Sequence, residues 1–144
     1  MRKGAPASRW WAEAEIDVQF FDLDPMQIVW HGNYVKYLEI ARCALLDKIG
    51  YNYVQMQASG YMWPVIDVSV RYIGSAVFGQ RLRLRAELVE YENRLKVDYL
   101  ITDAASGKRL TRASTSQVAV DIASGEMCFV SPPILFEKLG VPVP

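Results

Sequence analysis

One segment with helical periodicity, residues 33–49, places the strongest constraint on how this chain can fold. Apolar side chains recur in it at three- and four-residue intervals, and Gly50 follows as a typical helix end. Asn33, a residue type favoured at N-caps, stands at its start. The rows beside the main apolar stripe are also apolar, so we expect a sheet to wrap around the helix and leave only a charged strip exposed. The stripe consists of Tyr34, Tyr37, Leu38, Ala41, Leu45 and Ile49.

The rest of the chain has the two-residue periodicity of β-strands. Residues 11–21 alternate apolar and polar side chains, and Pro25 ends this first strand. Further strands, separated by short turns, are predicted at 61–72 (interrupted near Pro64), 80–92, 96–103, 109–122 and 127–130. A connection is expected at 51–60 and a short turn at 135–139. Antiparallel strands with one helix after the first strand predict an α+β fold. It is expected to form a single domain of residues 11–144 after a flexible lead of residues 1–10.

Composition narrows the class of protein. The 144 residues, 51% of them hydrophobic, suffice for one buried core. Sixteen basic and sixteen acidic residues cancel, which argues against nucleic-acid binding as the main activity. Cys43 and Cys128 are interpreted as free thiols of a reducing compartment. With no signal peptide and no apolar run long enough for a membrane span, a cytoplasmic protein is expected. One histidine and no cysteine pair predict neither a metal site nor another cofactor.

Residues 22–42 carry the most specific chemical pattern. Asp22 and Asp24 close the first strand, and the only histidine, His31, stands just before the helix. The start of a helix exposes unpaired N–H groups and the positive end of its dipole, which stabilise negative charge. Thioester hydrolysis needs a nucleophile or an activated water, together with donors for the oxygen that becomes negative. This stretch could supply both, although Asp24 could instead cap the turn before Pro25.

The same stretch resembles the signature of the 4-hydroxybenzoyl-CoA thioesterase family of hotdog-fold enzymes. The matching residues are Asp24-Pro25, Ile28-Val29-Trp30-His31, Asn33-Tyr34 and Tyr37-x-Glu39-x-Ala41-Arg42. Its His31-x-x-Tyr34 portion is most similar to the short-chain acyl-CoA thioesterases associated with the Tol–Pal operon. The resemblance implies an antiparallel sheet curled around one central helix. It also implies hydrolysis of an aromatic or short-chain acyl-CoA, with CoA as part of the substrate, by a homodimer or homotetramer with sites between subunits.

The resemblance also implies roles for individual residues. Asp24 would act as nucleophile or as general base. The backbone N–H at His31 would be an oxyanion donor, and the His31 imidazole could bond the thioester oxygen or the attacking water. Gln27 stands where many family members carry glycine, which is expected to affect the loop. Asp22 is interpreted as structural, although two neighbouring carboxylates could also raise one another's pKa and suit a base.

Substrate-binding residues are less specifically marked. Trp30, Tyr34 and Trp63, with Met62, are candidates for an acyl pocket, although residues of these types are more often simply part of the core. Arg94 and Lys96 beside a predicted hairpin turn could meet the CoA phosphates, or could be a solvated turn. Glu39 and Arg42, three residues apart, predict a local ion pair worth roughly a few tenths of a kcal/mol.

Other functions of a hotdog fold remain as alternatives. The acyl group could be carried by acyl carrier protein, although no one-sided charge marks a surface for it. A non-catalytic module that binds acyl ligands would be expected to lack the acid at position 24 and the pattern at the helix start. A dehydratase would need its histidine in a different motif. Because Asp24 and His31 stand in the thioesterase context, thioester hydrolysis agrees best with the sequence.

Overall fold

The computed structural model describes residues 9–144. Its elements in chain order are β1 (Trp11–Asp17), the 3₁₀ helix η1 (Phe20–Asp22), α1 (Asn33–Ile49), α2 (Tyr53–Ala58), β2 (Tyr61–Met62), β3 (Val65–Tyr72), β4 (Arg81–Glu90), β5 (Leu95–Asp103), β6 (Arg109–Gln117), β7 (Val120–Asp121) and α3 (Pro133–Leu139). None of the helices within these residues combines the length and the apolar character that crossing a membrane requires. The flexible lead predicted for residues 1–10 falls, up to residue 8, outside the described residues and stays a prediction. Arg9 and Trp10 are in contact with the domain, since the Arg9 guanidinium donates to the Leu139 carbonyl at 3.3 Å and Leu88 N–H donates to the Trp10 carbonyl at 2.9 Å.

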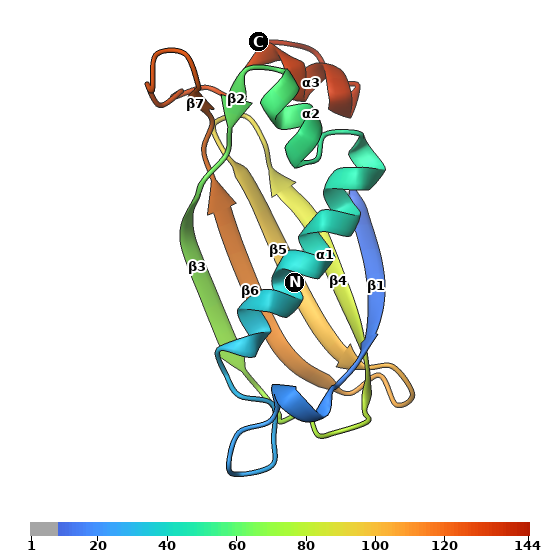
Figure 1. Ribbon diagram of the computed structural model, residues 1–144. Helices are drawn as coiled ribbons and strands as arrows, with labels where there is room; N and C mark the ends of the chain where they lie inside the picture. The colour runs from blue at the N-terminus through green and yellow to red at the C-terminus, as the bar shows by residue number, and fades with distance from the viewer. Residues whose placement is uncertain (1–8) are drawn as a thin grey trace.

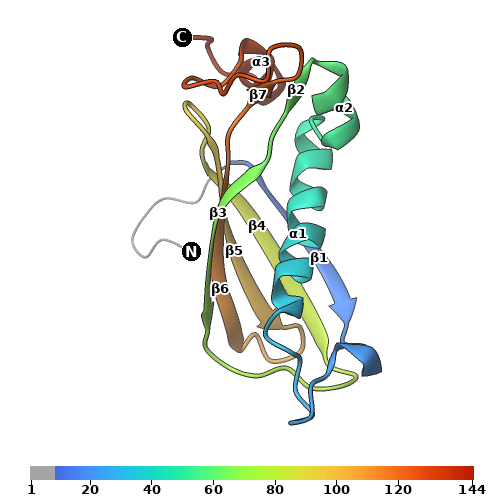
Figure 2. The same ribbon diagram turned by 60° about the vertical axis from the view of Figure 1, so that its left-hand side comes forward.

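Five antiparallel strands form the main sheet in the order β1-β4-β5-β6-β3, so β1 and β3 are its edges. Helix α1 crosses one face of this sheet and packs against β1, β4 and β5 (Figure 1). Turned by 60°, the molecule shows α1 on one side of the sheet only (Figure 2). This arrangement confirms the predicted α+β hotdog fold. The helix occupies the position that its apolar stripe predicted.

The core lies between α1 and the sheet. Tyr34, Leu38 and Leu45 on the helix are each at most 2% exposed, as are Leu84 of β4 and Val97 of β5. Each fully buried side chain of this size contributes about 1.5–3 kcal/mol through removal of apolar surface from water. The opposite side of α1 is exposed, and the expectation that only a charged strip would be exposed was wrong, since Val35 and Ile40 are exposed there as well.

Several predicted boundaries were wrong, each for a local reason. The first strand ends at Asp17 because η1 follows. The strand predicted at 61–72 divides into β2 and β3 around Pro64, and β3 is a sheet edge, as the proline predicted. The strand predicted at 127–130 is absent from the described residues, where Met127 makes only an isolated bridge to Val120.

The end of the molecule opposite the Asp24 loop carries elements that the sequence analysis missed or shortened. Helix α2 lies where a connection was expected, and α3 extends the predicted terminal turn. The start of α2 has a capping box, in which Asn52 bonds the first turn and the Gln55 side chain accepts from Asn52 N–H at 3.0 Å. This spacing could have revealed α2. Cys43 and Cys128 are free thiols, as predicted.

Candidate active site

Asp24 lies in a tight loop between η1 and α1. Leu23 and Val29 form an isolated antiparallel bridge, and inside it Asp24 N–H donates to the Ile28 carbonyl at 2.9 Å. The Gln27 N–H donates back to the Asp24 carbonyl at 2.9 Å. Gln27 has a φ of 63°, the left-handed conformation that favours glycine. The position where the family resemblance places glycine therefore adopts a glycine-like backbone with glutamine.

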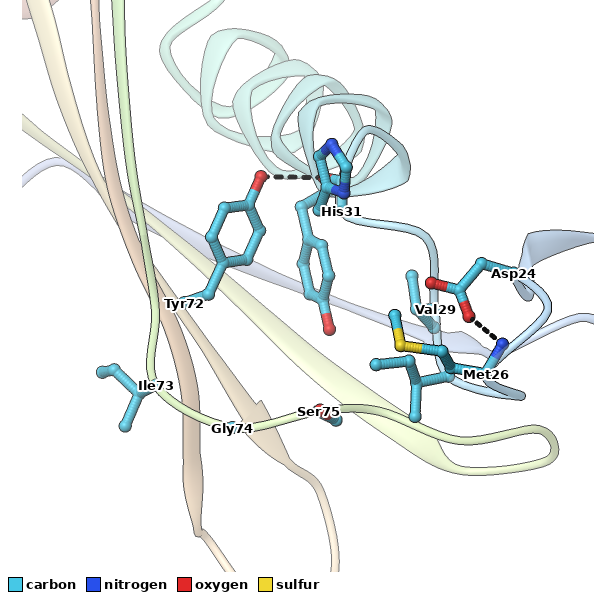
Figure 3. A pocket seen from close by; sticks show the side chains of 10 residues that line it. Asp24, Met26, Val29, His31, Tyr72, Ile73, Gly74 and Ser75 are labelled. Atoms are coloured by element: carbon cyan, nitrogen blue, oxygen red, sulfur yellow. Dashed lines mark hydrogen bonds between the residues drawn. The ribbon is translucent and has the colours of Figure 1, made fainter.

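The Asp24 side chain has one oxygen engaged and one available. Its Oδ1 accepts a hydrogen bond from Met26 N–H at 2.8 Å, which is the turn-capping role considered for this residue. The other oxygen has no hydrogen-bond partner within residues 9–144. The turn therefore orients the carboxylate and leaves one oxygen for chemistry (Figure 3). Capping and catalysis are compatible roles here.

Asp22 has the structural role that was favoured for it. Its Oδ2 accepts from Gln19 N–H and from the Tyr37 hydroxyl, both at 2.9 Å. Burial, together with this bond to Asp22, raises the pKa of the Tyr37 phenol. The Asp22 backbone carbonyl accepts from Trp30 N–H at 2.9 Å and from the Asn33 amide Nδ2 at 2.8 Å. Asp22 therefore joins the strand end to the helix start.

The start of α1 differs from the prediction. Asn33 was expected to be the N-cap, but the N-cap is Gly32, because the Asn33 amide bonds the Asp22 carbonyl instead. A Cβ at Gly32 would lie 2.4 Å from a ring atom of Trp30, so glycine lets this indole lie over the helix start. The N–H groups of His31 and Gly32 have no acceptor among the described residues. They are the available donors at the positive end of the helix dipole.

A cavity of about 230 Å³ brings these parts together. Asp24 and His31 both line it, and Tyr34 lines it from the first turn of α1 (Figure 3). Burial raises the pKa of the Tyr34 phenol, so this wall remains neutral near neutral pH. Within residues 9–144 no hydrogen bond or ion pair joins Asp24 to His31, and no three metal-binding side chains gather. The cavity is thus lined by the Asp24 carboxylate and by His31, and the helix start with its free N–H groups adjoins it.

The other predicted binding residues do not line this cavity. Trp30 is 49% exposed and packs on the His31 ring with centroids 5.3 Å apart. Trp63 is buried at the opposite end of the molecule and lines a second cavity of about 480 Å³. Arg94 pairs with Glu90 at 3.1 Å near the tip of the β4–β5 hairpin, and Lys96 follows in β5. In Figure 1 this tip lies at the α2 and α3 end, away from the Asp24 loop.

One wall of the cavity comes from β3 and the loop after it, and the sequence did not predict it. Tyr72, Ile73, Gly74 and Ser75 line the side facing the Asp24 loop (Figure 3). The two walls are joined where Val29 N–H donates to the Ala76 carbonyl at 2.9 Å. These residues lie more than forty positions from Asp24 in the sequence, and no local periodicity or motif indicated that they would line the same cavity.

Comparison with known proteins agrees with this fold. Residues 18–140 match the thioesterase-like superfamily. YneP of Bacillus subtilis, which is provisionally named an acyl-CoA thioesterase, is 30% identical over 128 residues, which make up 88% of this chain and 88% of that protein.

Two solved structures are similar over nearly the whole chain. Slr0204, a 1,4-dihydroxy-2-naphthoyl-CoA thioesterase from Synechocystis, has a TM-score of 0.79 at 20% identity and covers 93% of this chain and 99% of its own. The DHNA-CoA thioesterase of Staphylococcus aureus has a TM-score of 0.79 at 24% identity and covers 90% of this chain and 89% of its own. At these identities the two structures support the shared fold alone.

Proposed function

The chain belongs to the thioesterase-like superfamily and is a thioester hydrolase in class, and we propose that its substrates are acyl-CoA thioesters. The products would be a free carboxylic acid and CoA. One observation carries the proposal: a carboxylate with an available oxygen and the start of a long helix line the same cavity.

Asp24 would supply the oxygen nucleophile, directly or through a water. In the direct route the free Asp24 oxygen attacks the thioester carbon, the C–S bond breaks and CoA leaves as a thiolate. One water then hydrolyses the anhydride: its oxygen and one proton complete the free acid, its other proton goes to the CoA thiolate, and the Asp24 carboxylate is restored. In the base route Asp24 takes a proton from a water that attacks the same carbon, and that proton passes to the leaving sulfur. In both routes the carbonyl oxygen becomes negative. The free N–H groups of His31 and Gly32 would stabilise this charge, with the His31 imidazole as a further donor.

The active form would be a homodimer, or a tetramer made of two such dimers. Strand β3 is a sheet edge whose residues are all exposed except half-buried Val70. Val65, Ile66 and Val68 make this edge apolar, and an apolar edge strand invites pairing with another strand. If two β3 strands pair antiparallel about their midpoint, Tyr72 of one copy comes beside Val65 of the other.

Such a dimer would unite the two cavities. The cavity that contains Trp63 lies just before Val65, so it would adjoin the Asp24 cavity of the second copy. Trp63 would then serve the acyl group, as the sequence analysis proposed. Arg94 and Lys96, at the same end of the chain as Trp63, would also come nearer to the Asp24 site of the second copy and could meet the CoA phosphates.

The acyl group would be aromatic or short. Tyr34 and Tyr72 give the Asp24 cavity aromatic walls, which suit a planar acyl group. The similar enzymes from Synechocystis and Staphylococcus aureus are named for a naphthoyl-type aromatic thioester. Membership of the 4-hydroxybenzoyl-CoA branch predicts preference for an aromatic acyl-CoA, and membership of the Tol–Pal-associated branch predicts preference for a short-chain acyl-CoA. Measured substrate preference therefore decides between the two branches.

The test is release of free thiol from a panel of aromatic and short-chain acyl-CoAs by the unmodified protein and by Asp24→Asn. The substitution keeps the shape of the side chain and removes its charge, so kcat should fall by about a hundredfold or more. Asp17→Asn, an exposed aspartate of β1 paired with Arg81, is the matched control and should retain full activity. Equal activity of Asp24→Asn and the unmodified protein would refute the role of Asp24. If the unmodified protein hydrolysed none of the acyl-CoAs, the better explanation would be a substrate carried by acyl carrier protein or a module that binds acyl ligands without turnover.

A further inference from the structure

Tyr72, the last residue of β3, makes a hydrogen bond across the cavity to the helix start. Its hydroxyl donates to the backbone carbonyl of His31 at 2.8 Å (Figure 3). The same carbonyl accepts from Tyr34 N–H at 3.4 Å, a much longer contact. The stronger partner of this carbonyl is therefore a side chain from the sheet edge.

The ring of Tyr72 supports this contact. It packs edge-on against the His31 ring at 6.2 Å and the Tyr34 ring at 5.3 Å between centroids. Among the described residues, the Tyr72 bond is the one hydrogen bond that reaches the His31–Gly32 turn from the sheet. Tyr72 is 48% exposed, so burial in the core does not account for its placement.

Peptide geometry links this bond to the available donors. The carbonyl of His31 and the N–H of Gly32 belong to one planar trans peptide unit and point in opposite directions. Anchoring the carbonyl to Tyr72 therefore directs the Gly32 N–H away from Tyr72. Figure 3 shows Tyr72 and Asp24 on opposite sides of His31, so this direction is toward the Asp24 side of the cavity.

We propose that Tyr72 is a positioning residue, which holds the His31–Gly32 turn so that the free Gly32 N–H faces the thioester oxygen. This inference rests on the proposed thioesterase function. Tyr72 acts through the backbone of His31, without contact with the reacting atoms. A donor fixed in advance stabilises developing charge without reorganisation during the reaction, so the benefit appears in kcat.

The test compares Tyr72→Phe with a matched control, Tyr91→Phe. Tyr72→Phe keeps the ring and removes the hydroxyl, and kcat should fall by about tenfold with KM changed less than about twofold. Tyr91 lies at the far end and packs on Trp10 and Phe136, so loss of its hydroxyl should leave kcat unchanged. An unchanged kcat in Tyr72→Phe, or a rise in KM alone, would overturn the proposal.

A double-mutant cycle with His31→Ala identifies the group through which Tyr72 acts. The carbonyl of residue 31 persists in alanine, so Tyr72→Phe should reduce kcat by the same factor in both backgrounds. If the loss vanished in His31→Ala, Tyr72 would be acting through the imidazole ring, and the proposal would be wrong.

Amide hydrogen exchange provides a measurement that does not depend on turnover. The N–H groups of Asn33 and Tyr34, which are bonded within the turn, should exchange faster in Tyr72→Phe than in the unmodified protein or in Tyr91→Phe. Equal exchange in all three proteins would overturn the inference even where activity changed. If the unmodified protein hydrolysed no acyl-CoA, the proposed function would fail, and exchange would still decide whether Tyr72 holds the turn.

Discussion

Gln27 shows how a single backbone angle shapes the site. Its φ of 63° closes the loop that presents the Asp24 carboxylate, although a side chain in this conformation is strained. The left-handed conformation costs an L-residue about 1–2 kcal/mol of conformational free energy, and glycine does not have this cost. Glutamine at this position therefore lowers the stability of a functional loop.

Gln27→Gly should raise the free energy of unfolding by about 0.5–1 kcal/mol, because relief of strain exceeds the added freedom of the unfolded chain. Urea unfolding measures this value. Met26→Gly is the control in the same loop, since Met26 has no positive φ and should gain nothing. The strain argument fails if both variants change stability equally.

At the scale of elements, Arg42 joins α1, α2 and the sheet. Its side chain is 2% exposed and forms the predicted ion pair with Glu39. It also donates to the Tyr53 hydroxyl at 3.0 Å and to the Tyr99 hydroxyl at 3.4 Å. Burial acts to lower the pKa of Arg42, but Tyr99 and Tyr53 raise it overall, so the guanidinium stays charged. What the spacing predicted as a surface pair is a buried link between three elements.

Arg42→Ala should lower the free energy of unfolding by about 2–3 kcal/mol, through lost hydrogen bonds and an empty volume. Arg42→Met, which keeps most of the volume without a buried charge, should lose less. Lys36→Ala, on the exposed side of α1, should stay within about 0.5 kcal/mol of the unmodified protein in urea unfolding. A similar loss in Arg42→Ala and Lys36→Ala would show that the link contributes little.

The turn between β5 and β6 predicts a pH dependence of stability. Hydrogen bonds from Gln80 and from Ser106 lower the pKa of Asp103 from 3.8 to about 2. A carboxyl group with a lowered folded-state pKa stabilises the protein above its unfolded pKa, and this contribution is lost as the pH falls from about 4 to 2. Asp103→Asn should therefore lower Tm at pH 6 and make the fall in Tm between about pH 4 and 2 less steep. Identical Tm profiles for the two proteins would contradict this assignment.

At the scale of the whole molecule, the two sheet edges differ. Strand β1 carries Glu13, Glu15 and Asp17 and packs against α1, and charged side chains protect an edge against pairing. Strand β3 exposes Val65, Ile66 and Val68 beside Asp67 and Arg71, and it ends at the cavity. This contrast is the reason for proposing β3, and not β1, as the edge that pairs in the dimer.

Val68→Lys, at the midpoint of β3, should convert the proposed dimer to a folded monomer and reduce kcat/KM by about tenfold or more, because the site would lose the partner's cavity. Light scattering after size exclusion measures the mass. Glu13→Lys, on the β1 edge, should change neither mass nor activity. A fully active monomeric wild type, or a dimeric Val68→Lys, would refute assembly through β3.

The sequence by itself determined the features that depend on neighbouring residues. The helix at 33–49 and most strands follow from periodicity, and Gly50 ends α1 with a φ of 73° as a C-cap glycine should. The motif from Asp24 to Arg42 predicted the 4-hydroxybenzoyl-CoA thioesterase family, and the wider thioesterase-like superfamily is confirmed. Periodicity and helix-ending residues act between neighbours in the sequence, so a segment carries these preferences even before it contacts the rest of the protein.

Only the tertiary structure decided which distant groups share the site. Asn33 is not the N-cap that was expected, because its side-chain amide donates to the Asp22 carbonyl. Tyr72 reached His31, and Arg42 became buried, because sheet pairing and the packing of α2 brought residues far apart in sequence into contact. Such choices depend on the free energy of many simultaneous contacts, and no short segment of the chain contains that information.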